Sequence, residues 1–248
     1  MAAREAEKSQ TPLERILLLL AAVAVHPWLA VAVDLTGGSS HSPAQRRIAH
    51  HFRLAERLGA ETVTLAGQDV SATILDYDRR ATEVLGRYSF DLGVMFGYML
   101  IATEPLFSRY PFINDHPALP DGPIGTYQEV IAELMRTRAI ESGCMMNLVT
   151  GDVDRGPATS FCRFPIQDEL NQDAWDAIAG SALEAASLDE IVAMPLYADI
   201  RARGVARERP FLVETLGAIA KGALVVPPKT PLDLTASVER AVHSTRPV

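Results

Sequence analysis

The segment Phe112-Ile113-Asn114-Asp115-His116-Pro117-Ala118-Leu119-Pro120 decides the fold and holds much of the chemistry of this chain. In an extended strand, successive side chains point to opposite faces, so Asn114 and His116 share one face and Asp115 points the other way. Pro117 has no backbone N–H and disfavours a helical residue before it, which predicts that the strand ends at His116. We therefore expect an amide and an imidazole at the mouth of a loop, where open α/β sheets bind ligands.

A carboxylate follows about forty residues later, in Val153-Asp154-Arg155-Gly156-Pro157. The glycine and the proline allow a tight turn. Asn114, His116 and Asp154 together would provide an oxyanion donor and an acid/base pair, whereas Asp115 is assigned no chemistry. Each of these residue types also occurs as an ordinary cap, turn or strand-end residue, and that alternative stays open.

Length, composition and net charge predict a globular protein that binds a small molecule. The chain has 248 residues, of which 48% are hydrophobic, and this is enough for a sizeable core. The net charge of -8 argues against nucleic acid or an anionic membrane as the main partner, because both favour a basic surface. A small metabolite is the expected ligand, and the composition does not indicate the oligomeric state.

The two cysteines, Cys144 and Cys162, show neither a CxxC spacing nor a nearby histidine pair. This pattern supports neither a metal site nor a disulfide framework. We expect two buried free thiols in a protein of the reducing cytoplasm.

An uncharged apolar run extends from Ile16 to Val33 and is interrupted by His26-Pro27-Trp28. We interpret it as parts of two buried strands, within residues 13–25 and 29–35, as in a parallel sheet. A membrane span or a secretory signal is the alternative; the acidic residues before the run disfavour it.

The loop that follows, residues 36–43, could bind a phosphate through Gly37, Gly38 and Ser39, because free backbone N–H groups before a helix can hold an anion. It lacks the spacing of known phosphate loops, so a flexible connection is the competing interpretation. The pattern then predicts a helix over 44–58, a strand over 61–65, and a helix over 69–87 with Val70, Ile74, Tyr77 and Val84 on its inner side.

The rest of the chain continues the alternation of strands and helices. Strands are expected at 91–96, 143–149 and 158–166, and short helices at 104–110 and around Val238. Thr126 and Glu129 form the pattern of a capping box that opens a helix to about Arg138. Longer helices are expected at 175–186, 188–203 and 207–221. This rhythm predicts a three-layer, Rossmann-like α/β fold with a mainly parallel sheet and helices on both faces.

The stretches "GYMLI", "INDHPALPDGPIGTYQEVI" and "NLVTGDVDRGP" together resemble the folate-dependent formyltransferase family, and within it the phosphoribosylglycinamide formyltransferases. The resemblance runs from about residue 77 to 222. It implies that Asn114, His116 and Asp154 are catalytic, and that 10-formyltetrahydrofolate is the cosubstrate. The residues it implies for folate binding are Tyr98, Met99, Leu100, Ile101, Val149, Thr150, Gly151, Asp152 and Val153.

Residues 13–77, by contrast, are similar to the universal-stress-protein-like domain of sensor kinases. We therefore expect a join near residues 76–80, with a front segment at 13–80, a formyltransferase-like domain at 81–222 and a tail at 223–248. The chain departs from the family pattern in two places. Asn147 stands where a second histidine is expected, and the glycine-rich phosphate loop of the family is not found in its usual form.

The resemblance implies formyl transfer to a primary amine, with glycinamide ribonucleotide of purine biosynthesis as the favoured acceptor. Two alternatives stay open. One is a formyltransferase with another amine acceptor, such as an amino sugar. The other is a non-catalytic folate-binding or nucleotide-binding regulatory protein, which the two departures favour.

Overall fold

The structure is a computed structural model, and it describes residues 16–20, 31–34, 61–64, 74–88, 90–96, 101–178 and 183–244. The expected helix at 44–58 and the expected phosphate loop lie outside these residues. The chain divides into two compact units, and each is described by itself. The first contains Met1–Asn114, Leu148–Gly156 and Ile219–Val225, and the second contains Asp115–Asn147, Pro157–Ala218 and Val226–Val248.

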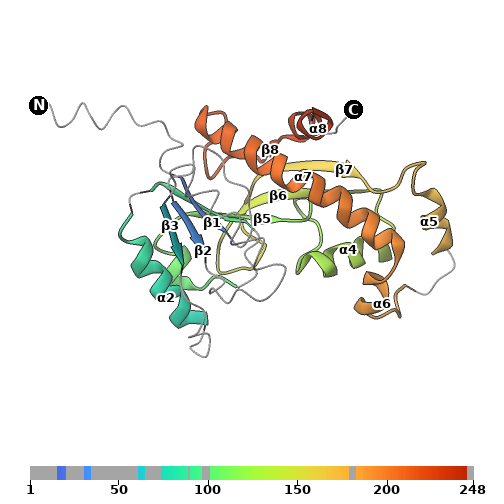
Figure 1. The fold of residues 1–248 in the computed structure, drawn as a ribbon, viewed down its shortest axis with the longest axis horizontal. Coiled ribbons are helices and arrows are strands. Elements are labelled where there is room, and N and C mark those ends of the chain that lie inside the picture. Colours follow the sequence, from blue (N-terminus) through green and yellow to red (C-terminus); the bar gives the residue numbers. More distant parts are fainter. Residues whose placement is uncertain are drawn as a thin grey trace, which may run out of the picture. The chain divides into compact units, whose positions relative to one another are not determined.

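The sheet of the first unit consists of parallel strands (Figure 1). Their order is β3 (Glu61–Thr64), β2 (Val31–Asp34), β1 (Ile16–Leu20), β4 (Leu92–Phe96) and β5 (Phe112–His116). Leu17 of β1 lies opposite Val31 of β2 in a parallel pair, which confirms the interpretation of the apolar run as strands. The strand expected at 91–96 and the end of β5 at His116 are also confirmed.

All five residues of β4 are buried, as expected for a central strand covered on both sides. Gly93 of β4 lies opposite Phe112 of β5, and a Cβ atom at Gly93 would lie 2.0 Å from Cε1 of the Phe112 ring. The ring therefore occupies the space that a side chain at position 93 would need. This contact fixes how β4 and β5 pack.

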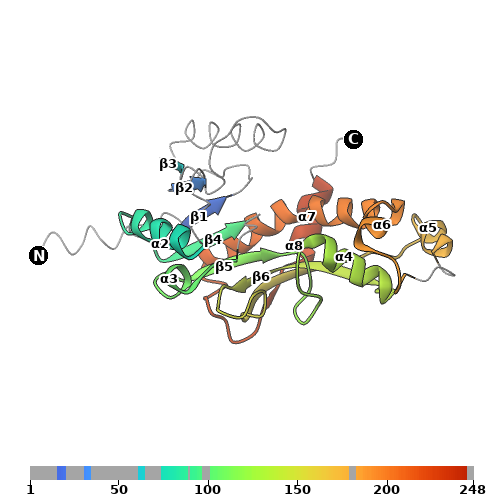
Figure 2. The ribbon, with the colours of Figure 1, turned by 90° about the horizontal axis from the view of Figure 1, so that it is seen from below.

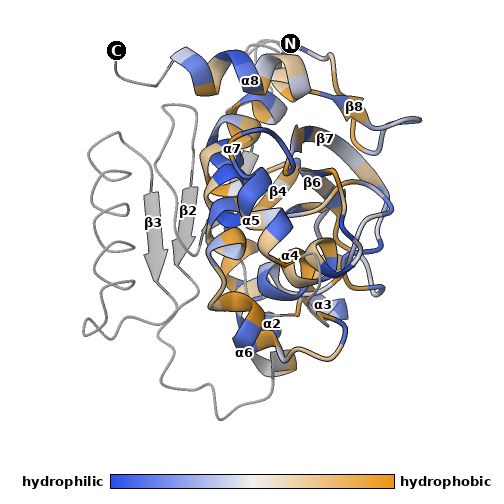
Figure 3. Ribbon diagram, turned by 90° about the vertical axis from the view of Figure 1, so that its right-hand side faces the viewer, coloured by the Kyte–Doolittle hydropathy of each residue, from blue (hydrophilic) through white to orange (hydrophobic). Residues whose placement is uncertain are grey.

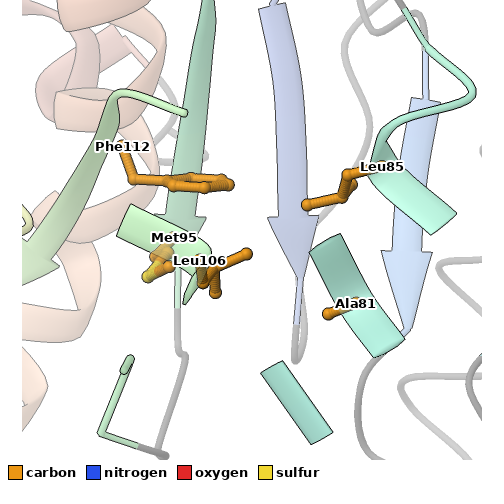
Figure 4. Packing of buried hydrophobic residues seen from close by; sticks show 5 residues of the cluster. All are labelled: Ala81, Leu85, Met95, Leu106 and Phe112. Atoms are coloured by element: carbon orange, nitrogen blue, oxygen red, sulfur yellow. The ribbon is translucent and has the colours of Figure 1, made fainter. Parts of the chain in front are cut away.

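The core of the first unit forms around that ring, where Ala81, Leu85, Met95, Leu106 and Phe112 are each at most 1% exposed (Figure 4). These residues come from β4, β5, α2 (Ile74–Leu85) and α3 (Glu104–Phe107). Burying a Leu or a Phe contributes about 1.5–3 kcal/mol. The cluster therefore binds the helices to the strands.

Helices α2 and α3 lie against each other (Figure 2). Among the α2 residues whose burial the structure describes, Asp78, Ala81, Thr82 and Leu85 are buried, whereas Val84, which was expected to face inward, is only half-buried. The other expected inner side chains, Val70, Ile74 and Tyr77, lie outside that description. Oδ2 of Asp78 accepts a hydrogen bond of 2.6 Å from the hydroxyl of Thr103, the residue before α3. The buried face of α2 therefore includes a carboxylate that links the two helices.

The second unit makes the sheet mixed, so the prediction of a mainly parallel sheet is wrong. Strand β6 (Glu141–Leu148) pairs antiparallel with β7 (Ala158–Pro165), and β7 pairs parallel with the short β8 (Leu232–Asp233). A parallel crossover needs about a dozen residues or more, usually with a helix. The segment 149–157 is shorter than that, and it returns the chain in the opposite direction.

The helices of the second unit differ from the expected ones. The capping box of Thr126 and Glu129 is present at the start of α4 (Tyr127–Arg136), and α8 (Thr235–Ser244) contains Val238. The predicted helix at 175–186 is the shorter α5 (Gln172–Ala177). The predicted helices at 188–203 and 207–221 are instead α6 (Leu188–Val192) and one continuous α7 (Pro195–Ala220) that includes Pro210.

Packing explains why α7 continues through the expected break. The helix carries both hydrophilic and hydrophobic residues (Figure 3). Phe211 and Leu212 are buried, and the hydroxyl of Thr215 lies 2.9 Å from that of Ser160 in β7. Arg203 forms an ion pair with Asp168 and another, of 2.9 Å, with Asp199. The buried side chains and the contacts with Ser160 and Asp168 outside the helix, together with the ion pair to Asp199 within it, outweigh the weak helix propensity of glycine and proline.

Candidate active site

The structure brings together two of the three candidate catalytic residues. Asn114 and Asp154 are both half-buried, and Nδ2 of Asn114 lies 3.5 Å from Oδ1 of Asp154. This distance is at the long end for a hydrogen bond, so the contact orients the two groups more than it stabilises them. Since the amide has a second N–H, it keeps one donor available.

The backbone of the loop 149–156 is held in a defined conformation. The N–H of Val149 donates to the carbonyl of Phe112 at 2.9 Å, which ties the start of the loop to β5. A Cβ atom at Gly156 would lie 1.8 Å from the carbonyl oxygen of Leu148, so only glycine fits there. Asp154 itself has a φ of 55°, a left-handed conformation that Asp tolerates better than most residues.

His116 is buried, at 2% exposed, and this corrects the expectation of an imidazole at the mouth of a loop. Its Nε2 atom lies 3.0 Å from the carbonyl oxygen of Pro123. The segment after β5 folds back because it turns tightly: the N–H of Gly122 donates to the carbonyl of Leu119 at 2.9 Å, and Asp121 has a φ of 64°. The imidazole is therefore covered by the loop that it was expected to open into.

Asp115 is the polar residue that sequence reasoning set aside. Its Oδ1 atom is inaccessible to solvent and accepts no hydrogen bond from any residue that the structure describes. Burial raises the pKa of this carboxyl well above its usual range, and the nearby Glu208 raises it further, whereas Arg201 acts in the opposite direction. Asp115 lies in β5, a strand that begins with the buried residues Phe112 and Ile113. A charged residue in such an apolar strand was the sequence signal that could have identified it.

The candidate folate-binding residues fall into three groups. Val149 packs against the core of the first unit, and Thr150 is half-buried. Gly151, Asp152 and Val153 are exposed, as is Ile101. The remaining candidates, for the folate slot and for a phosphate, lie outside the described residues: Tyr98, Met99, Leu100, Gly37, Gly38 and Ser39.

Two further features of the sequence lie in strands β6 and β7. Cys144 and Cys162 are free and buried, as predicted, and they lie directly opposite each other in the β6–β7 pair. Asn147, the residue found where a histidine was expected, is 2% exposed in β6.

Within the described ranges, no group of three or more His, Cys, Asp or Glu side chains could hold a metal ion. In the same part of the chain, none of the helices has the length and apolarity needed to span a bilayer.

The geometry of the first unit can support acyl-type chemistry. An amide beside a carboxylate provides a donor for a developing oxyanion and an acceptor for a proton. Asp154 lies outside the helices and strands. The left-handed backbone at Asp154 and the close approach of Gly156 to Leu148 determine the position of its carboxylate.

Comparison with solved structures identifies the fold. The chain is similar to glycinamide ribonucleotide transformylase 1 from Symbiobacterium toebii, with a TM-score of 0.59 and 20% identity over 90% of this chain and 94% of that one. It is also similar to phosphoribosylglycinamide formyltransferase from Coxiella burnetii, with a TM-score of 0.57 and 15% identity over 84% and 87% of the two chains. For the enzyme from Streptococcus pneumoniae the TM-score is 0.51, at 20% identity over 82% and 98%.

No protein-family model and no curated protein sequence matches the chain. Residues 77–222 are a little over half of the chain, so a likeness that covers 90% of it must extend into the front segment as well. The resemblance of residues 13–77 to a stress-protein-like domain is not shown by any of these comparisons. The chain is an α/β protein with a mixed sheet and a formyltransferase-like fold.

Proposed function

We propose that this protein transfers the formyl group of 10-formyltetrahydrofolate to a primary amine. The contact between Asn114 and Asp154 carries the proposal, because it joins an amide donor and a carboxylate on a formyltransferase-like fold. The fold alone does not specify an activity. The amide of Asn114 and the carboxylate of Asp154 are the groups that would carry out the reaction.

In the proposed reaction, the amine attacks the formyl carbon and the carbonyl electron pair moves to oxygen. Asn114 would donate its second N–H to that oxyanion, and a donor of this kind contributes about 3 kcal/mol to the transition state. Asp154 would take the proton that the amine loses, directly or through water. When the bond between the formyl carbon and N10 breaks, N10 receives a proton and tetrahydrofolate leaves.

Glycinamide ribonucleotide is the favoured acceptor. The supporting observation is that the similar structures from Symbiobacterium toebii, Coxiella burnetii and Streptococcus pneumoniae have names that refer to this amine. An amino sugar is the alternative acceptor. The three candidate phosphate-binding residues lie outside the described residues, and assays with the two acceptors in parallel distinguish them.

A second candidate function is favoured by the state of His116. Its ring is buried and one ring nitrogen already faces the carbonyl of Pro123. Asn147 cannot titrate, unlike the histidine expected there. These two features suit a non-catalytic folate-binding or nucleotide-binding regulatory protein that keeps the fold.

The experiment that separates the two is an assay of formyl transfer from 10-formyltetrahydrofolate to glycinamide ribonucleotide and, in parallel, to amino sugars. Binding of a folate analogue is measured on the same sample by its effect on the melting temperature. Turnover that Asn114→Ala and Asp154→Asn both abolish supports the enzyme. Folate binding without turnover on any acceptor rejects the enzyme and supports the regulatory protein.

A further inference from the structure

The 2 cysteines of the chain, Cys144 and Cys162, lie directly opposite each other in the antiparallel pair of β6 and β7. In the same pair of chains, the N–H of Ile166 donates to the carbonyl of Ile140 at 3.0 Å. Hydrogen-bonded positions of an antiparallel ladder recur at every second residue, so 144 and 162 form such a position. The two thiols therefore project from the same face of the sheet.

The spacing of such a position suits a disulfide bond. The Cα atoms of a hydrogen-bonded antiparallel pair are about 5.5 Å apart, and disulfides span Cα distances of about 4.4–6.8 Å. Directly opposite Cβ atoms are about 4.5–5.5 Å apart, whereas a disulfide prefers about 3.8 Å. The bond therefore requires β6 and β7 to approach each other slightly, without any change of strand pairing.

Helix α7 covers the face from which the thiols project. Ser160 and Phe164 share that face with Cys162, because side chains alternate along a strand. The hydroxyl of Ser160 lies 2.9 Å from that of Thr215 in α7. The guanidinium of Arg207, also in α7, lies 4.6 Å from the centre of the Phe164 ring. Both cysteines are consequently only 1% exposed, and neither thiol can turn outward to solvent.

The two thiols differ in reactivity. The thiol of Cys144 donates a hydrogen bond to the sulfur of Cys162, which lowers the pKa of Cys162; burial raises this pKa, and the nearby Arg207 lowers it. The same hydrogen bond and burial raise the pKa of Cys144. Because the thiolate is the form that attacks an oxidant, Cys162 reacts first and Cys144 follows.

We propose that Cys144 and Cys162 are a dithiol that hydrogen peroxide oxidises to a disulfide between β6 and β7. The burial of both thiols selects an oxidant of about the size of water. In the first step the thiolate of Cys162 attacks one peroxide oxygen and the O–O bond breaks. The departing hydroxide takes up the proton that the thiol lost, and Cys162 becomes a sulfenic acid.

In the second step the sulfur of Cys144 attacks the sulfur of Cys162. The S–O bond breaks, and the hydroxide leaves as water with the proton of Cys144. In sum, two thiols and one hydrogen peroxide give one disulfide and two waters. Each sulfur is oxidised by one electron, and the peroxide is reduced by two.

The wild-type protein tests the proposal without any substitution. The folded protein is treated with a small excess of hydrogen peroxide, quenched with catalase and alkylated in denaturant before its intact mass is measured. We expect a monomer that has lost two hydrogen atoms and takes up no alkylating reagent. Thiols that stay reduced, a bond between two chains, or oxygen added to sulfur without a disulfide each overturn the proposal.

Two matched substitutions test the order of the steps. Serine keeps the size and the hydrogen-bond donor of cysteine, so we expect both variants to fold, which circular dichroism checks. Cys144→Ser should stop at the sulfenic acid of Cys162, which dimedone labels. Cys162→Ser should be labelled at least about tenfold more slowly. Equal labelling or the opposite order shows that Cys162 is not the sulfur that reacts first.

A last measurement compares the folded and the unfolded chain. A disulfide that fits the fold stabilises it, and by linkage the folded protein favours the bond by the same factor. In a glutathione redox buffer, we expect the equilibrium constant for the bond to be at least about tenfold larger in the folded protein than in urea. The gain stays below the full effect of loop closure because the strands must approach. An equal or smaller constant in the folded protein shows that β6 and β7 do not hold the sulfurs in bonding geometry and overturns the proposal.

Discussion

Nδ2 of Asn114 lies 3.5 Å from Oδ1 of Asp154, although the two residues are 40 positions apart in the sequence. Asn114 belongs to a strand and Asp154 to a turn with a left-handed backbone. Neither residue owes its position to the other, because the backbone bond from Val149 to Phe112 and the contact at Gly156 already fix the turn. The contact between the two side chains is therefore not needed to hold the turn, and the two side chains can serve a function instead.

Asp154→Asn should lower formyl transfer by about 10²-fold or more, because the amide cannot accept the proton that the amine loses. The melting temperature should stay within about 2 °C of the wild type, since Asn tolerates the left-handed conformation nearly as well as Asp. Steady-state kinetics and thermal unfolding of the same sample check both parts.

The matched control is Asp121→Asn, which makes the same chemical change at an exposed Asp that also has a positive φ, of 64°. It should leave both activity and melting temperature unchanged. A loss of activity in the control as large as that of Asp154→Asn would mean that the effect comes from charge or turn geometry in general, and Asp154 would have no special role.

Gly156→Ala should destabilise the protein by more than about 2 kcal/mol, as expected when a new side chain collides with backbone. The added Cβ atom would lie 1.8 Å from the carbonyl oxygen and 2.8 Å from the carbonyl carbon of Leu148, and neither can move without displacing β6. Activity should fall as well, because Asp154 lies two residues before the collision. Urea unfolding gives the change in free energy.

Gly151→Ala serves as the comparison in the same loop. Its Cβ atom would be 3.8 Å from the ring of Phe107, which is ordinary contact, so a change within about 0.5 kcal/mol is expected. Equal destabilisation by the two substitutions would show that the whole loop, and not the approach of Gly156 to Leu148, determines the effect.

Much of the fold could be predicted from local patterns. The apolar run gave β1 and β2, Pro117 gave the end of β5, and Thr126 with Glu129 gave the start of α4. The direction of β7 was missed because the pattern of a buried strand does not indicate parallel or antiparallel pairing. The continuous α7 was missed because its stability through Gly204 and Pro210 comes from contacts with distant residues such as Ser160 and Asp168.

The site was predictable as a set of residue types but not as a geometry. Alternation along the strand gave a shared face for Asn114 and His116, and the turn residues predicted the tight loop around Asp154. Two features depend on contacts that no local pattern shows. One is the closure of the 117–125 turn over His116, and the other is the burial of Asp115 among groups of α7.

The close contact of Gly93 with Phe112 leads to a prediction about the register of β4 and β5. Gly93→Ala should destabilise strongly, because the Cβ atom would lie 2.0 Å from one ring carbon and 2.1 Å from the next. Phe112→Leu alone should cost about 1–3 kcal/mol of packing. In the double variant the smaller side chain makes room, so the two costs should not add. A coupling energy above about 1 kcal/mol from chemical unfolding is expected, and additive costs would contradict the observed register.

The buried carboxyl of Asp115 should make the stability depend on pH in a defined direction. Its pKa is raised in the folded protein above the ordinary value of 3.8, chiefly by burial and then by Glu208. Below about pH 3, well under the ordinary value of 3.8, the carboxyl is protonated in both the folded and the unfolded chain and has no effect. As the pH rises, the unfolded chain loses this proton first, which favours unfolding until the folded carboxyl also ionises.

Asp115→Asn removes this ionisation while keeping the shape of the side chain. The unfolding free energy of the variant relative to that of the wild type should therefore rise as the pH increases from 3 to 7, in the direction set by the raised pKa of Asp115. The difference between the two proteins should be smallest at the acid end of this range. Arg201 remains in its ion pair with Glu208 in both proteins, so that pair does not produce the difference. Urea unfolding between pH 3 and pH 8 measures it, with Asp121→Asn as the exposed control. Parallel pH profiles for Asp115→Asn and the wild type would show that the Asp115 carboxyl is ionised in the folded protein as readily as in the unfolded chain.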